Sequence, residues 1–324
     1  MSTLSGRGDR RTYLMGFENA SPDGGKIKRG NVSASWLDWG GDGEPLVLLH
    51  PNGFCAGIYD PLARRLADRY RVVGIDLRGH GASGDVVDAA ILGNDDMALD
   101  ALAVIDHLGF EHFALVGVSS GGAVGGEIAA VAPERVAALV LCEAIAIDAR
   151  SSQIEHFAHT EDDHPLAVGA RRRRDVWDDR ASVLASYGSR APLDQLDPAA
   201  LAGYVRWGFR DRSDGRIELS CRPETEALVF GNSVRHGPVE SFEALRRVAT
   251  DGRVPAAVLA GSTSGLDMTW FRAQAEVLGV GLQIVEGGHF FLFENIARGV
   301  ALLEENLDAL EVAGTQASGS VGNQ

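Results

Sequence analysis

The stretch ALVGVSSGGAVGG at residues 114–126 decides the fold of this chain. The apolar run at 113–118 predicts a buried strand, and the small residues that follow predict a helix ending before Pro133. Between them, Gly117-Val118-Ser119-Ser120-Gly121 fits the G-x-S-x-G pattern of a sharp strand-to-helix turn that exposes a serine. From this stretch alone two other interpretations stay open: the glycine turn of a dinucleotide-binding fold, and close helix–strand packing without chemistry.

The rest of the chain places this turn inside a repeating α/β pattern. Helical patterns separate short apolar runs, which lie at 45–50, 71–77, 113–118, 136–142, 255–261 and 281–287. Such alternation predicts right-handed βαβ crossovers and a mostly parallel sheet flanked by helices. At least three strands come before the turn, whereas a dinucleotide-binding glycine turn follows the first strand. The order of elements therefore argues against the dinucleotide interpretation.

The alternation is interrupted by a polar stretch between about residues 148 and 245. This stretch has helix-like pieces, no clear strand, and the run RRRR at 171–174, which we interpret as a solvated helix face, with contact to a substrate anion as the alternative. An insertion after a strand end lies over the sheet edge where open α/β proteins bind ligands, so we expect it to cover a site. We predict a flexible N-terminus at 1–25, a core at 26–147 and 246–312, a helical cap at 148–245 and a disordered tail at 313–324.

A serine nucleophile needs a base, and His289 is the candidate. It lies in the glycine-containing stretch VEGGHFFLFEN, after the last predicted strand and before the last helix. In the fold that uses the G-x-S-x-G turn, the chain order is serine, acid, histidine. The order of Ser119 and His289 fits that scheme.

Five stretches together resemble the α/β-hydrolase superfamily, over about residues 30–148 and 250–312: LVLLHPNGF, VVGIDLRGHGAS, LVGVSSGGAVGG, APERVAALVL and VEGGHFFLFEN. The resemblance implies an α/β-hydrolase fold with a helical cap inserted after the sixth strand, and Ser119 and His289 as catalytic residues. It also implies oxyanion donors from the backbone of Ser120 and Asn52, with Gly53 as the alternative to Asn52. His80, in VVGIDLRGHGAS, is then expected to be structural.

The acid departs from the pattern of most relatives, in which an aspartate stands where this chain has Ser264. Asp267 lies further along the same loop and is one substitute. Glu143 follows the sixth strand, and a carboxylate between apolar residues at a strand end is costly to bury without a partner. Zearalenone-type lactonases and certain haloalkane dehalogenases place their acid there, but the dehalogenases use an aspartate nucleophile. We therefore predict Glu143 as the acid, with Asp267 as the alternative.

Aromatic residues of the cap are candidates for the wall of a substrate pocket. Tyr204, Trp207 and Phe209 belong to the stretch YVRWGFRDRSDGRIEL, although core packing within the cap explains them equally well. Phe54, Trp177 and Met268 complete the predicted substrate contacts.

Composition excludes several classes of partner. The formal net charge of −15 disfavours nucleic acid and anionic membrane surfaces, and no apolar stretch approaches the length of a membrane span. The three cysteines are scattered without a CxxC pair, and the N-terminus does not resemble a signal peptide, so we expect a cytoplasmic protein. The His- and acid-containing stretch at 155–164 matches no zinc motif, and we predict no metal and no cofactor.

These features predict a serine hydrolase that cleaves an apolar ester or lactone through an acyl-enzyme, including resorcylic macrolactones such as zearalenone; a homodimer is compatible with them. The alternatives are a C–C hydrolase of diketone-like substrates, a cofactor-free dioxygenase of the same fold, and a non-catalytic binding protein.

Overall fold

The structure is a computed structural model that describes residues 21–150, 159–233 and 237–321. Its main sheet has eight strands in the order β1-β2-β4-β3-β5-β6-β10-β11. Their bounds are β1 Asp23–Arg29, β2 Val32–Gly40, β3 Pro45–Leu49, β4 Arg71–Asp76, β5 Phe113–Val118, β6 Val136–Cys142, β10 Ala256–Gly261 and β11 Leu282–Val285. β2 pairs antiparallel with β1 and β4, and the other neighbours pair parallel. The predicted α/β-hydrolase fold with a mostly parallel sheet is therefore confirmed.

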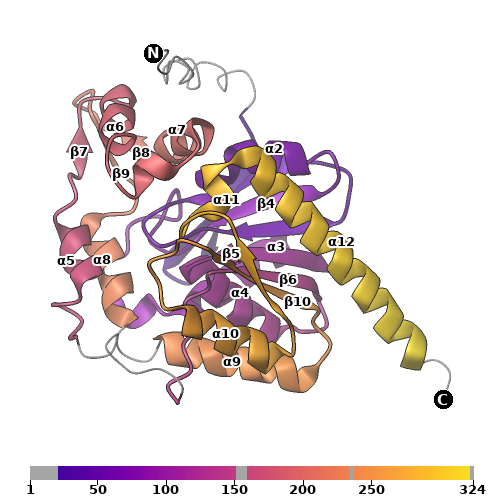
Figure 1. The fold of residues 1–324 in the computed structure, drawn as a ribbon. Helices are drawn as coiled ribbons and strands as arrows, with labels where there is room; N and C mark the ends of the chain where they lie inside the picture. Colours follow the sequence, from indigo (N-terminus) through magenta and orange to yellow (C-terminus); the bar gives the residue numbers. More distant parts are fainter. Residues whose placement is uncertain (1–20, 151–158, 234–236, 322–324) are drawn as a thin grey trace, which may run out of the picture.

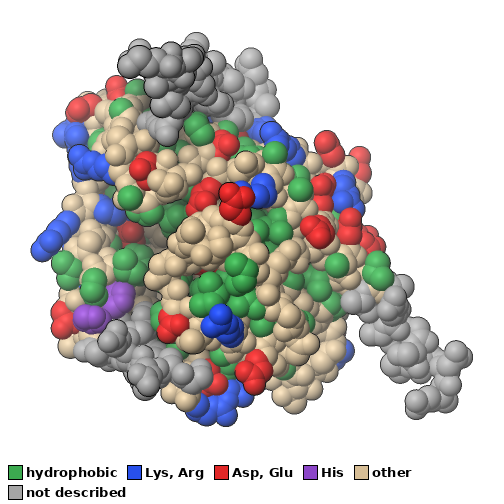
Figure 2. All heavy atoms as spheres, in the orientation of Figure 1, with side chains coloured by type: hydrophobic (Ala, Val, Ile, Leu, Met, Phe, Trp, Pro, Cys, Tyr) green, Lys and Arg blue, Asp and Glu red, His purple; other side chains and the backbone are tan. Residues whose placement is uncertain are grey.

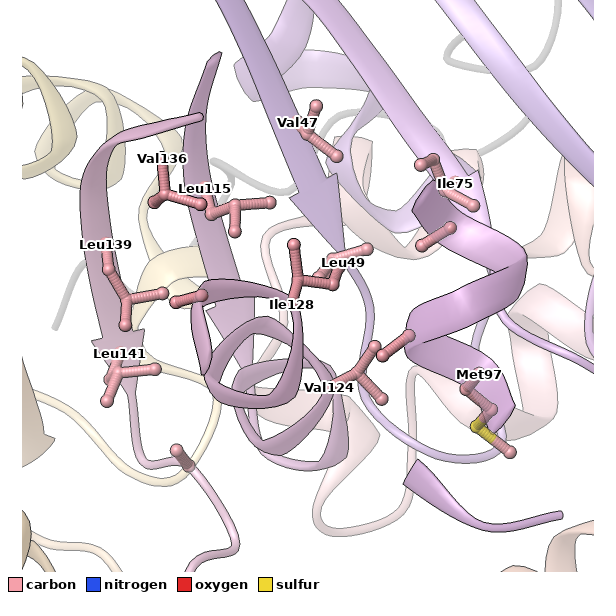
Figure 3. Close-up of a cluster of buried hydrophobic side chains, with 14 of the residues drawn as sticks. Val47, Leu49, Ile75, Met97, Leu115, Val124, Ile128, Val136, Leu139 and Leu141 are labelled. Atoms are coloured by element: carbon pink, nitrogen blue, oxygen red, sulfur yellow. The ribbon is translucent and has the colours of Figure 1, made fainter. Parts of the chain in front are cut away.

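Helices cover both faces of this sheet (Figure 1). The helices on one face are α3 Asn94–His107, α4 Ser120–Val131, α9 Gly237–Asp251 and α10 Met268–Leu278. Those on the other face are α2 Asp60–Leu66, α11 Phe291–Glu294 and α12 Ile296–Val321. Each face thereby buries its own apolar cluster. Figure 3 shows part of the first cluster, with Val124 and Ile128 of α4 among Leu49, Leu115 and Leu139 of the strands.

The remaining α-helices and strands of the described residues lie together beyond one edge of the main sheet (Figure 1). They are α5 Pro165–Arg171, β7 Val176–Trp177, α6 Arg180–Tyr187, α7 Pro198–Trp207, β8 Phe209–Asp211, β9 Ile217–Leu219 and α8 Pro223–Asn232. The strands form a small antiparallel sheet in the order β7-β9-β8, although the sequence predicts no clear strand here. Strands of two or three residues are too short to show the alternating pattern by which a strand is predicted. We call this unit, residues 159–233, the cap; its independence as a domain stays a prediction.

The two chain ends differ from expectation where they are described. Within the predicted flexible segment 1–25, residues 1–20 lie outside the described part, and β1 begins at Asp23. α12 continues through Val321 and so includes most of the segment predicted as a disordered tail. Extending an existing helix costs far less than starting one, and no proline interrupts this segment.

The surface is charged and mixed in sign. Figure 2 shows acidic and basic side chains interspersed over the face drawn. Within the described residues, no helix is both long and apolar enough to cross a bilayer.

Candidate active site

Ser119 stands at the turn between β5 and α4 in a backbone conformation that few residues adopt, with φ 58° and ψ −121°. The Ser119 N–H donates to the Cys142 carbonyl at 3.0 Å, and the Ser119 carbonyl accepts from Ile145 N–H at 3.1 Å. The turn requires glycine at position 121, because a Cβ there would lie 2.2 Å from the Leu49 carbonyl oxygen. A strained residue held by its neighbours in this way is typical of functional sites.

Glu143 follows β6 directly and is fully buried. Its Oε1 accepts from Gly261 N–H at 2.7 Å, and its Oε2 accepts from the Ser264 hydroxyl at 2.7 Å. Glu143 also has a positive φ of 48°. A buried carboxylate needs such partners, since without hydrogen bonds its burial is very costly.

His289, in the loop between β11 and α11, completes this group. Its Nδ1 lies 2.6 Å from Glu143 Oε2, which fixes the proton on Nδ1 and leaves Nε2 as the acceptor. Ser119 and His289 line the same cavity, although no hydrogen bond joins Ser119 to His289 among the described residues. Catalytic hydrogen bonds often tighten only when substrate binds, so His289 can serve as the base for Ser119 without a hydrogen bond between them here.

The alternative acid, Asp267, has a different local role. Its carboxylate accepts from Thr269 N–H at 2.9 Å and caps the N-terminus of α10. The side chain of Ser264, at the position where the resemblance leads us to expect an aspartate, instead bonds to Glu143. The sequence analysis assigns no role to Ser264. The one signal for its contact with the acid is its place in the chain, where the resemblance leads us to expect an aspartate.

The loop after β3 carries the candidate oxyanion donors. The Gly53 N–H donates to His80 Nε2 at 3.0 Å, so this alternative donor is already bonded. The structure describes no hydrogen bond from the Asn52 N–H, and Asn52, Ser119 and Ser120 line the same cavity. Burial lowers the pKa of His80 to about 3, which keeps its ring neutral and able to accept. His80 thus has the structural surroundings expected from the sequence.

The cavity above Ser119 has a volume of about 1360 Å³. Of the predicted substrate contacts, Phe54, Trp177 and Tyr204 line it, whereas Trp207, Phe209 and Met268 do not. Trp207 packs on Gly57, Phe209 is buried in the apolar cluster of the second face, and Met268 packs against the first. Spacing alone does not separate side chains that face a cavity from side chains that fill a core.

The arginine run corrects a second expectation. Only Arg171 belongs to α5, and it pairs with Glu224 at 3.0 Å on the surface. Arg172, Arg173 and Arg174 follow the helix end and line the cavity. The interpretation as a solvated helix face holds only in part: Arg172 and Arg174 are exposed but lie beyond the helix end, and the Arg173 side chain is only 20% exposed. Of the described residues, no group of three or more His, Cys, Asp or Glu is placed to hold a metal ion.

The chain belongs to the family with the α/β-hydrolase fold, which it matches over residues 44–213. It is 39% identical over 232 residues to the dihydrolipoyllysine-residue acetyltransferase component of the acetoin cleaving system of Pseudomonas putida. The match covers 66% of this chain and 60% of that protein. It is 34% identical over 100 residues to the pimeloyl-[acyl-carrier protein] methyl ester esterase of Aliivibrio salmonicida. That match covers 31% of this chain and 36% of that protein. The chain therefore spans less than two thirds of either relative.

Among solved structures, E-2-(acetamidomethylene)succinate hydrolase superposes with a TM-score of 0.73 at 21% identity. The match covers 89% of this chain and 99% of that chain. At this identity the likeness shows the fold alone.

Proposed function

We propose that the protein is a serine hydrolase that cleaves a carboxylic ester or lactone through an acyl-enzyme. The observation that carries the proposal is the 2.6 Å contact of the buried Glu143 with Nδ1 of His289, a residue that lines the same cavity as the strained Ser119. These groups supply a nucleophile, a base of fixed tautomer and a charge that orients the base.

In the proposed reaction, His289 Nε2 takes the proton of Ser119 as the hydroxyl oxygen attacks the carbonyl carbon. Glu143 stabilises the imidazolium that forms, and its other hydrogen bonds hold the carboxylate in place. His289 then gives the proton to the leaving alcohol. Water, activated by the same nitrogen, attacks the acyl-enzyme and releases the acid.

The backbone N–H groups of Asn52 and Ser120 are the proposed oxyanion donors. Ser120 is the first residue of α4, where the N–H groups have no partner within the helix. Donors that are fixed before the reaction stabilise the negative charge at no cost of reorganisation. The engaged Gly53 N–H supports Asn52 over Gly53 as the second donor.

For the substrate we propose an apolar ester or a lactone as large as the macrolactone zearalenone. Ligand cavities commonly measure roughly 300–1,000 Å³, and the present one, at about 1360 Å³, is wide enough for a macrocycle. Phe54, Trp177 and Tyr204 offer apolar surface. The position of Glu143 after β6 supports the lactonase comparison, and the esterase similarity supports ester cleavage.

The test is covalent labelling of the folded protein with a fluorophosphonate, followed by turnover of simple esters, macrolactones and diketones with oxygen monitored. We expect labelling at Ser119, none in Ser119→Ala, and ester or lactone turnover without oxygen uptake. Oxygen consumption would favour the dioxygenase, and turnover of diketones alone would favour the C–C hydrolase. Absence of labelling in folded protein would overturn the nucleophile.

A further inference from the structure

Side chains of the cap bind the loop that carries Asn52. The Tyr204 hydroxyl, from α7, donates to the Gly53 carbonyl at 2.9 Å. The Asn52 side-chain amide donates to the carbonyl of Glu226, in α8, at 3.0 Å. Two separate cap helices therefore contact the residues on either side of the Asn52–Gly53 peptide bond.

Arg173 joins these two helices. Its Nη1 forms an ion pair with Glu226 Oε2, and its Nη2 donates to the hydroxyls of Tyr204 at 2.8 Å and Tyr187 at 2.9 Å. The Arg173 side chain is 20% exposed and that of Glu226 is 10% exposed. Charge-assisted hydrogen bonds in such a poorly solvated place are strong and directional.

The ion pair lies directly against the loop. Gly53 has a φ of 77°, and a Cβ there would stand 2.6 Å from Glu226 Oε1 and 3.2 Å from Arg173 Nη1, so another residue would be strained and would displace the pair. From the opposite side, His80 Nε2 accepts the Gly53 N–H. The loop is therefore hydrogen-bonded both to His80 of the core and to Tyr204 and Glu226 of the cap.

We propose that Arg173 is a positioning residue that sets the place of the Asn52 N–H, so that the cap completes the oxyanion hole. The inference rests on the proposed function, because it assigns the Asn52 N–H to the developing oxyanion. The rate is sensitive to a displacement of the donor by about 1 Å. The reason is that the N–H must point to the place of the oxyanion in the transition state, and not to the carbonyl oxygen of the bound substrate. Arg173 acts through Glu226 and Tyr204 and needs no contact with the substrate.

The arginine run provides a matched control. Arg171 pairs with Glu224 at 3.0 Å, so it joins the same two cap segments, but it lies on the surface and outside the cavity lining. Arg171→Met and Arg173→Met remove the same charge and each break an ion pair to α8. Only Arg173→Met removes a group connected to Asn52 and Gly53.

The experiment measures kcat and KM with a neutral p-nitrophenyl ester, together with the rate of fluorophosphonate labelling. For Arg173→Met we expect kcat and the labelling rate to fall by about 10²-fold, the size of losing one oxyanion donor, with KM within about 3-fold of wild type. Arg173→Lys should recover part of kcat, because an ammonium can still pair with Glu226. Arg171→Met should stay within about 2-fold in kcat and KM.

A second variant keeps the inference testable if Arg173→Met does not fold. Tyr204→Phe keeps the ring and removes the hydrogen bond to the Gly53 carbonyl, and we expect kcat about 5- to 10-fold lower. The inference is overturned if wild type is labelled at Ser119 while Arg173→Met and Tyr204→Phe keep kcat, or if they change only KM. If wild type is not labelled, the proposed function itself fails.

Discussion

The two sides of the cavity are built in different ways. On the sheet side, Ser119, Glu143 and His289 each follow a strand end, and backbone N–H and carbonyl groups fix the first two. On the cap side, Arg173 and Glu226 meet across 53 positions of sequence through side chains alone. The proposed catalytic groups thus lie at strand ends, whereas the loop of the proposed oxyanion donor Asn52 also contacts a cap network held by one long-range ion pair, Arg173–Glu226.

The largest expected effect concerns the acid. Glu143→Gln should lower kcat by about 10⁴-fold, because a neutral amide neither stabilises the imidazolium nor enforces the tautomer of His289. Asp267→Asn should stay within about 2-fold, since asparagine also caps a helix. Steady-state kinetics with a simple ester measure both, and thermal unfolding checks that the variants fold. The reverse ranking would move the acid to Asp267.

The second prediction tests the sheet side through its backbone. Gly121→Ala should destabilise the protein by about 3 kcal/mol, because the added Cβ meets the Leu49 carbonyl oxygen at 2.2 Å, and backbone cannot move away easily. Denaturant unfolding measures the change in the free energy of unfolding. Gly169→Ala, whose Cβ would meet nothing within 4 Å, is the control and should not be destabilised. Equal stability of Gly121→Ala and wild type would contradict the tight packing of the turn.

Much of the sheet side could be predicted from sequence because its signals are local. The apolar runs placed six strands within two residues of their bounds. Ser119 was recognisable from its glycines, and Glu143 from its costly place between apolar residues at a strand end. His289 followed from chain order. These hypotheses needed residues next to strand ends, their order along the chain and the resemblance to a family, but no knowledge of which helices pack together.

The cap side could not be predicted in the same way. The partner of Arg173 depends on how α8 packs, and nothing in the run at 171–174 distinguishes Arg173 from the exposed Arg172 and Arg174. Trp207 and Phe209 lie close in sequence to Tyr204, yet only Tyr204 faces the cavity. Such distinctions arise from tertiary packing, because neighbouring residues of one segment point in different directions and only some of them line the cavity.

The third prediction concerns the core-side support of the oxyanion loop. Burial lowers the pKa of His50 to about 4 and that of His80 to about 3, while the unfolded chain binds these protons near pH 6.5. The free energy of unfolding should therefore fall as pH drops from about 6.5 toward 4, by up to about 1.4 kcal/mol per pH unit for each histidine. Glu127, whose pKa burial raises to about 7, contributes the opposite slope.

Two variants isolate the histidine contribution. His80→Gln should flatten the dependence of unfolding free energy on pH between 6.5 and 4, because the unfolded chain then binds one proton fewer. His112→Gln, which makes the same replacement at an exposed position, is the control for the substitution itself. Denaturant unfolding at several pH values measures the slopes, and identical slopes for His80→Gln and wild type would count against a neutral His80.

The smallest expected effect belongs to Ser264, which supports the acid. Glu143 Oε2 accepts from both Ser264 and His289, while Oε1 accepts from the Gly261 backbone. Ser264→Ala removes one of three bonds, and a net loss of about 1 kcal/mol corresponds to roughly a 5-fold lower kcat with KM unchanged. The exposed Ser262 lies in the same loop, and Ser262→Ala should match wild type. If Ser264→Ala were as damaging as Glu143→Gln, hydrogen bonding from this side chain and not the backbone would fix the acid, and the contrast between the two sides of the cavity would fail.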